Sequence, residues 1–247
     1  SGASLIGTRE RKRMSAGKGI CLVCGEPLAY FEEAQEVTCQ ICGKKETGHS
    51  VCVAGHYVCD ACHRAGGVEH IMAVCRETDS KNPIRIAQKI MGDKSIYPNG
   101  PEHHTLIGAS LMAAYKNAGG DIDLDKALAE LQKRSLLVPG GTCGFWGTCG
   151  AATSVGQWWS IVSGSTPMTR DPWAQTQRLT SRILGKLADL GGPRCCKRTG
   201  FTAILEGVAF AKEMHGVEME VPEKVTCAFY TRNAECLKEG CPFYPNK

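Results

Sequence analysis

The chain has 247 residues, of which 43% are hydrophobic and 22% are charged, and its formal net charge is +4. This composition is ordinary for a globular protein and argues against a disordered one. The small net charge does not by itself indicate a nucleic-acid or membrane partner. The length allows one domain or two.

Basic residues are concentrated at the amino end of the chain: Arg9, Arg11, Lys12, Arg13 and Lys18. Such a run is usually solvated and mobile, so we expect residues 1–19 to form a flexible basic tail, with contact to an acidic partner as the alternative. Ser1 and Gly2, without a leading Met, resemble an expression remnant. Because the sequence has neither an apolar run of about 20 residues nor a signal-peptide stretch, we expect a cytoplasmic protein without a membrane partner.

Fifteen cysteines are present, which is an odd number, and many of them occur as C-x2-C pairs. In a secreted protein they would indicate disulfides. Without an export signal, the pairs favour thiolates bound to metal ions in a reducing compartment.

Four ligand pairs with two intervening residues lie within the first third of the chain: Cys21 and Cys24, Cys39 and Cys42, His49 and Cys52, Cys59 and Cys62. This spacing lets both side chains of a tight turn reach one tetrahedral ion. The same stretch has short polar and glycine-bearing segments between the pairs and little helical periodicity, so apolar burial alone cannot fold it. We therefore expect residues 20–66 to form a finger in which two zinc ions replace a hydrophobic core.

The order of these pairs resembles the cross-brace of RING-like zinc fingers, in which the first and third pairs share one ion. The resemblance implies one site of Cys21, Cys24, His49 and Cys52, and another of Cys39, Cys42, Cys59 and Cys62. His56 and His63 are close enough in sequence to replace His49. Zinc with four protein ligands stabilises a fold and leaves no position for a substrate, so we expect a structural role.

The rest of the chain is expected to be α-helical. The segment 67–82 reads as a short helix followed by a linker, and Asn82 and Pro83 are typical of a helix start. Beyond it, helical patterns alternate with glycine turns, which predicts helices over residues 83–91, 101–118, 124–135, 151–162, 172–190 and 200–215. The fold class is thus mostly α: a small zinc finger followed by a helical domain, 83–247, with a cysteine-rich tail.

Seven cysteines of the helical domain are candidate cofactor ligands: Cys143, Cys149, Cys195, Cys196, Cys227, Cys236 and Cys241. The first two lie in a glycine-rich loop, 139–150, whose backbone can approach a large cofactor closely; a tight connection between helices is the alternative. Cys75 is an ordinary buried thiol. A cysteine followed by proline, as at Cys241, also occurs in ferredoxin-type ligation, yet a third zinc fits the spacing as well as an iron–sulfur cluster does.

Residues 147–156 and 191–198 resemble segments of the iron–sulfur L-serine dehydratases and L-cysteine desulfidases. In those enzymes three cysteines hold a four-iron cluster whose open iron binds the substrate and helps to expel its hydroxyl or thiol. The resemblance implies that Cys149 and Cys196 are two of the ligands. The middle cysteine of that family has no counterpart here, so the third ligand would come from Cys143, Cys195 or the tail.

A broader similarity extends over most of residues 98–245, in the stretches 100–104, 139–143, 147–150, 192–198 and 236–242. These resemble an uncharacterised family of anaerobic bacteria and methanogenic archaea, known only as a domain of unknown function. The resemblance implies a habitat and supplies no activity.

Four residues are candidates for acid–base work or substrate binding: His103, His104, Lys197 and Arg198. The histidines open a predicted helix, whose amino terminus favours the neutral imidazole that serves as a base; a capping or surface histidine is the alternative. The lysine and arginine could hold a substrate carboxylate.

Together these features favour an iron–sulfur-dependent lyase or sulfur-handling enzyme that acts on a small anionic substrate. The alternative is a non-catalytic zinc-binding adaptor that contacts a protein or, less favoured, a nucleic acid.

Overall fold

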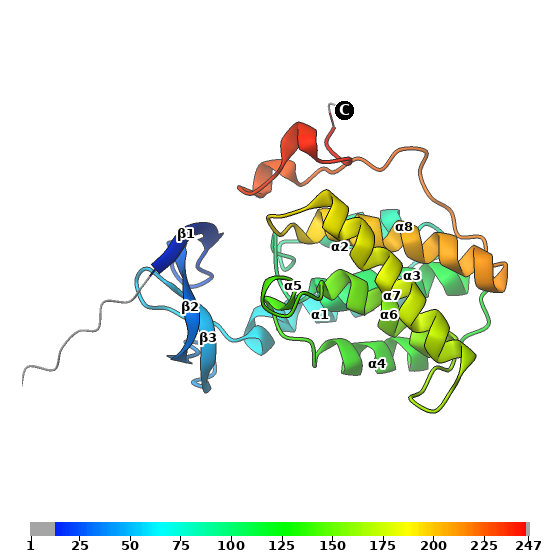
Figure 1. Ribbon diagram of the computed structural model, residues 1–247, viewed down its shortest axis with the longest axis horizontal. Helices are drawn as coiled ribbons and strands as arrows, with labels where there is room; N and C mark the ends of the chain where they lie inside the picture. Colours follow the sequence, from blue (N-terminus) through cyan, green and yellow to red (C-terminus); the bar gives the residue numbers. More distant parts are fainter. Residues whose placement is uncertain (1–12, 246–247) are drawn as a thin grey trace, which may run out of the picture. The chain divides into compact units, whose positions relative to one another are not determined.

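The structure is a computed structural model that describes residues 13–245 (Figure 1). The chain divides into two compact units, one ending at Cys62 and the other beginning at His63. Of the expected flexible tail, residues 1–12 lie outside the described residues, whereas residues 13–19 belong to the first strand.

The first unit is built on a three-stranded antiparallel sheet in the order β1-β2-β3: β1 (Arg13–Ile20), β2 (Pro27–Thr38) and β3 (Lys45–Cys52). Only Ala29, Phe31 and Val37 of β2 are buried apolar side chains. The sequence patterns did not predict these strands. So little apolar burial supports the expectation that this unit needs another source of stability.

The second unit is helical, and its first helix, α1, begins within the last residues of the first unit. Its helices are α1 (Asp60–Glu77), α2 (Pro83–Met91), α3 (His103–Asn117), α4 (Leu124–Ser135), α5 (Thr142–Phe145), α6 (Gly150–Val162), α7 (Asp171–Leu190) and α8 (Cys196–His215). The tail contains two short 3-10 turns, Tyr230–Arg232 and Lys238–Gly240. The mostly α fold is confirmed, and six helices match their predicted ranges within a few residues. Helix α1 is longer than the helix expected after residue 67.

Helix α3 is the centre of the helical unit and packs against α2, α4, α6 and α8 (Figure 1). Thirteen of its 15 residues are buried, so almost none of its surface faces solvent. Two glycines allow this close packing. A Cβ on Gly108 would lie 2.9 Å from the backbone oxygen of Ser154 on α6, and one on Gly207 of α8 would lie 2.8 Å from the side chain of Leu111.

Two ends of the predicted helices, the start of α2 and the end of α8, carry the expected caps. The Asn82 side chain accepts a hydrogen bond from the Arg85 amide at 3.0 Å, with Pro83 at the first helical position. Helix α8 ends at Gly216, whose φ of +65° is the left-handed conformation that favours glycine. Local sequence signals therefore define these helices well.

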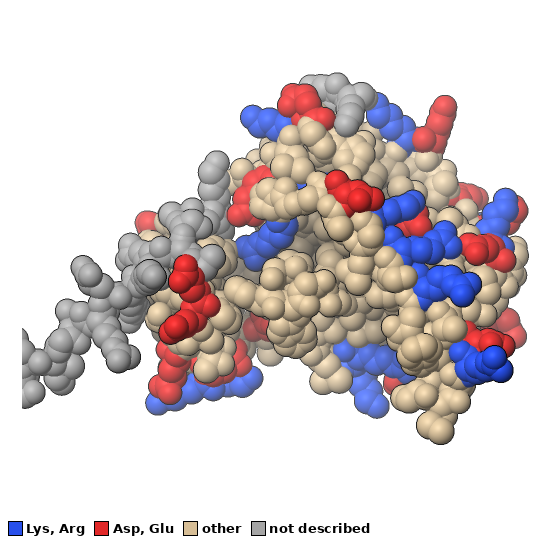
Figure 2. All heavy atoms as spheres, in the orientation of Figure 1, with Lys and Arg blue, Asp and Glu red and all other residues tan. Residues whose placement is uncertain are grey.

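No helix within residues 13–245 is both long and apolar enough to cross a membrane. On the face shown in Figure 2, Lys and Arg side chains lie among Asp and Glu side chains. This face does not present a large patch of one sign to a charged polymer.

Candidate metal centres

The first unit contains two groups of possible metal ligands: Cys21, Cys24, Cys52 and His56 in one, and Cys39, Cys42, Cys59 and Cys62 in the other. Within each group all ligand atoms lie within 4.8 Å of one another. The Sγ atoms of Cys24 and Cys52 are 3.4 Å apart, and those of Cys42 and Cys59 are 3.7 Å apart. A tetrahedral zinc with Zn–S bonds of about 2.3 Å needs sulfurs about 3.8 Å apart. Both groups can hold a metal ion such as zinc.

The interleaved order of the ligands agrees with the cross-brace, but the expected ligand His49 is replaced by His56. His49 lies on β3 with its Nδ1 3.4 Å from the backbone oxygen of Phe31 on β2. In a strand, residues three apart point to opposite faces, so His49 and Cys52 cannot both face one ion. His56 follows β3 in a turn, and its Nδ1 lies 3.2 Å from the Sγ of Cys24.

Tight turns aim backbone amides at the sulfurs of these groups. The amides of Val23 and Ala54 donate to the Sγ atoms of Cys21 and Cys52 at 3.4 and 3.3 Å. Burial alone would raise the pKa of Cys21, but the backbone hydrogen bonds outweigh it and lower the pKa to about 7. The thiolate, which is the metal-binding form, is thus accessible near neutral pH.

In the helical unit, a buried chain of polar groups begins at the amino end of α3. Glu102 is fully buried, with one oxygen 3.3 Å from Nδ1 of His103 and the other 3.4 Å from Nδ1 of His63. Nε2 of His103 lies 2.9 Å from Nζ of Lys197, which also donates to the backbone oxygen of Tyr97 at 2.5 Å. A carboxylate, an imidazole and an ammonium therefore lie in series.

Burial and the neighbouring charges set the protonation of this chain. Burial, followed by the charge of Lys197, lowers the pKa of His103 to about 4, so the imidazole is neutral at pH 7. Burial lowers the pKa of Lys197 to about 8. Burial alone would raise the pKa of Glu102, but the contacts with His103 and His63 lower it well below its usual range, so the carboxylate is ionised.

The Glu102 carboxylate lies over Gly100, where a Cβ would come within 2.2 Å of one oxygen. Within the described part of the chain, neither oxygen accepts a well-formed hydrogen bond. Sequence reasoning gave Glu102 no role and considered His63 only as a possible zinc ligand in place of His49, whereas the structure places His63 against Glu102. The available signal was the acidic residue directly before two histidines at a helix start, but burial could not be read from that pattern.

His104 is also buried, so the surface alternative is wrong for both histidines. Its Nδ1 lies 3.2 Å from the backbone oxygen of Val138. The opposite edge of the ring lies against Gly150, where a Cβ would come within 2.1 Å of Nε2. His104 thus faces the amino end of α6, directly after Cys149.

The seven candidate cysteines of the helical unit fall into two sets, and the adjacent Cys195 and Cys196 belong to different sets. The first set, which we call the trio, contains Cys143, Cys149 and Cys196. Burial first, and then the charge of Cys149, raises the pKa of Cys143. Burial raises the pKa of Cys196 to about 12, with Glu102 and Cys149 adding to the rise. Cys149 thus interacts electrostatically with both other members of the trio, and Cys196 also interacts with Glu102 and Lys197 of the buried polar chain.

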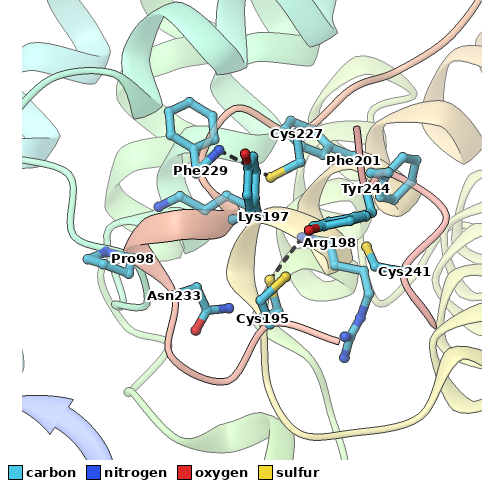
Figure 3. A pocket seen from close by; sticks show the side chains of 13 residues that line it. Pro98, Cys195, Lys197, Arg198, Phe201, Cys227, Phe229, Asn233, Cys241 and Tyr244 are labelled. Carbon is cyan, nitrogen blue, oxygen red and sulfur yellow. Dashed lines mark hydrogen bonds between the residues drawn. The ribbon is translucent and has the colours of Figure 1, made fainter. Parts of the chain in front are cut away.

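The second set lines a cavity between the amino end of α8 and the tail (Figure 3). We call this cavity the tail pocket. Its empty volume is about 410 Å³, including the part open to solvent, and its sulfur-bearing residues are Cys195, Cys227, Cys236 and Cys241. The charges of the other three thiols contribute to the raised pKa of Cys227, after burial. One cysteine at the start of α8 and three from the tail therefore line one cavity.

Arg198, which also lines the tail pocket, is buried and braces the loop before α8. Its Nη2 donates to the backbone oxygens of Gly191 and Pro193 at 2.8 and 2.7 Å. This guanidinium group is thus already engaged by the protein backbone.

No curated protein and no solved structure matches this chain. One family model matches residues 71–244, which covers the end of α1, all helices after it, and the tail up to residue 244. The family carries no assigned activity, and its description adds nothing to the chemistry of the centres. By this match, the chain belongs to the family described as "Family of unknown function (DUF5714)".

Proposed function

We propose that the protein is an iron–sulfur-dependent lyase or sulfur-handling enzyme of the cytoplasm, acting on a small anionic substrate, with structural zinc in its first unit. One observation carries the enzymatic part. Cys196 of the trio interacts electrostatically with a buried chain of Glu102, His103 and Lys197, whose polar groups are costly to bury.

Three thiolates and a nearby carboxylate fit a reactive metal centre better than a structural one. Closed structural sites have four protein ligands, as in the first unit. A four-iron cluster held by only three thiolates supplies an open iron that binds a hydroxyl or thiol as a Lewis acid. The trio is also absent from the described groups whose ligand atoms lie within 4.8 Å, which is the spacing of a single ion.

The side chains around the trio have roles that suit a β-elimination. Lys197, whose charge acts on Cys196, is positioned to bind a substrate carboxylate, and His103 holds its ammonium in place. His104 takes the proton from the substrate Cα while the Cβ–S or Cβ–O bond breaks and its electron pair leaves with the sulfur or oxygen. The Nδ1 contact of His104 with Val138 orients the ring so that Nε2 faces the segment after Cys149.

The test is to purify the protein without oxygen, measure iron and sulfide, and assay pyruvate release from L-cysteine and L-serine. Cys149→Ala and Cys196→Ala are each expected to lower activity by at least about 100-fold, with zinc unchanged. Cys75→Ala is the matched control, because Cys75 is a fully buried free cysteine of α1 outside both sets.

A colourless protein that is indifferent to oxygen would overturn the proposal. Full retention of iron in both trio variants would overturn the assignment of the trio. If iron binding depends on the trio but neither amino acid is turned over, the lyase activity is excluded. The sulfur-handling activity at the same centre would then be the remaining proposal.

One observation favours the adaptor instead. Several apolar side chains are exposed on the turns that carry the metal ligands of the first unit: Leu22, Val23, Ile41 and Val53. Exposed apolar groups gathered on a small metal-bound unit suit contact with a protein partner. This second function would be supported if a protein partner still binds when the trio cysteines are replaced, but no longer binds when Ile41 is replaced by Asp.

A further inference from the structure

We infer that the tail pocket holds a second iron–sulfur cluster, ligated by Cys195, Cys227, Cys236 and Cys241 and separate from the centre at the trio. The inference stands on the geometry of this pocket and does not require the proposed enzymatic activity.

The spacing of the four thiols points to a cluster and away from a single ion. The two groups of the first unit have the compact spacing of a tetrahedral ion, with all ligand atoms within 4.8 Å. The four pocket cysteines form no such compact group in the described part of the chain, although all four line one cavity. In a four-iron cluster each thiolate binds a different iron, so the sulfurs stand further apart than around one zinc.

Backbone amides are aimed at the pocket sulfurs in the same way as in the first unit. The amides of Arg198, Phe229 and Lys238 donate to the Sγ atoms of Cys195, Cys227 and Cys236, each at 3.4 Å. The first two of these bonds are visible in Figure 3. An amide of Phe243 likewise lowers the pKa of Cys241, although burial raises it more. Hydrogen bonds from backbone N–H groups to sulfur stabilise thiolates and tune the reduction potential of iron–sulfur clusters.

The walls of the pocket suit a buried anionic group. The aromatic rings of Phe201, Phe229 and Tyr244 line the pocket (Figure 3). Phe243 adds a further apolar ring to the lining. The cations Lys197 and Arg198 also line the pocket. A cluster bound by four thiolates carries net negative charge, which these two side chains offset.

Four thiolates occupy every iron of the cluster, so this centre has no position for a substrate. Its role is to fix the tail onto α8. The tail has only two short 3-10 turns as regular structure, and three of its cysteines lie within 15 residues, from Cys227 to Cys241. Metal ligation thus replaces the backbone ladders that the tail lacks.

The experiment is anaerobic reconstitution of the full chain with iron and sulfide, followed by metal analysis and Mössbauer spectroscopy. Two four-iron centres predict about eight irons per chain. Cys236→Ser, at a half-buried position, is expected to lose about half of this iron and to expose the tail to protease. Cys149→Ala should retain the iron of the tail pocket, and Cys75→Ala should retain all of it.

The outcomes separate this inference from the proposed enzyme. About four irons per chain, lost in Cys236→Ser and kept in Cys149→Ala, would support the tail cluster and defeat the centre at the trio. Unchanged iron in Cys236→Ser, or zinc in place of iron in the pocket, would overturn the inference. Because the wild-type iron count is measured independently, a poorly folding variant does not leave the question open.

Discussion

The two units of this protein stabilise themselves by different means. In the first, about 50 described residues bury three apolar side chains of β2, and two groups of metal ligands close its turns. In the second, an apolar core surrounds α3, and the cysteines add to a fold that is already complete. Small domains need metals or disulfides because they cannot bury enough surface. We therefore expect the first unit to need its cysteines for folding, and the second to have cysteines available for other chemistry.

Removing zinc gives the largest expected effect and tests this contrast directly. A zinc-selective chelator should unfold the first unit, because structural zinc contributes about 10–16 kcal/mol of binding free energy that nothing else there replaces. The helical unit should persist. All four tryptophans lie in it, so their fluorescence reports on that unit alone. A first unit that still resists protease after complete zinc removal would contradict the prediction.

Replacing His56 and His49 in turn by alanine tests which of them binds zinc in the first unit. His56→Ala should release one of the two zinc ions, since it removes a ligand whose Nδ1 lies 3.2 Å from Cys24. The loss of affinity should exceed the roughly 10- to 100-fold cost of losing an outer-shell partner. His49→Ala is the matched control and should keep both ions. Zinc titration with a competing dye measures both, and equal losses would refute the assignment of His56.

A smaller effect on the free energy of unfolding is expected from the titration of His103 as the pH falls. Its folded pKa of about 4 lies below the ordinary value, so the unfolded chain binds more protons in between. This contribution to stability is complete above about pH 6.5 and is lost as the pH falls toward 4, by an amount on the order of 3 kcal/mol. His103→Asn should make the free energy of unfolding less dependent on pH between 4 and about 6.5. Urea unfolding followed by tryptophan fluorescence at several pH values measures it, and parallel curves for both proteins would show that His103 is not responsible.

The helices could be predicted because their signals are local. Asn82 and Pro83 mark a start, Gly216 marks an end, and the apolar period between such points is regular. The strands of the first unit could not be predicted, because the apolar residues of β2 do not alternate regularly and its pairing with β3 shifts register between Tyr30 and Gln35. A shift of this kind interrupts the alternation on which strand prediction relies.

The sequence indicates which residues are candidate ligands, but it does not indicate which of them share one metal centre. Spacing identified seven of the eight residues of the first unit, but His49 was chosen because a two-residue gap was assumed to form a turn. In the helical unit the division between Cys195 and Cys196 depends on the backbone: Cys195 is the extended cap of α8, whereas Cys196 is its first helical residue. Spacing along the chain carries no information about that change of direction.

The position of the tail pocket's ligands along the chain also orders events during synthesis. The first unit has all its ligands once Cys62 has been made, but the tail pocket is complete only at Cys241, which is 179 residues later. At 5–20 residues per second this interval is roughly 10–35 s. Cys195 is made 46 residues before Cys241, so its set of partners stays incomplete for roughly 2–9 s of this interval. The unfinished chain would therefore present an unpaired thiol to the cell, and delivery of the cluster would have to wait for the completed tail.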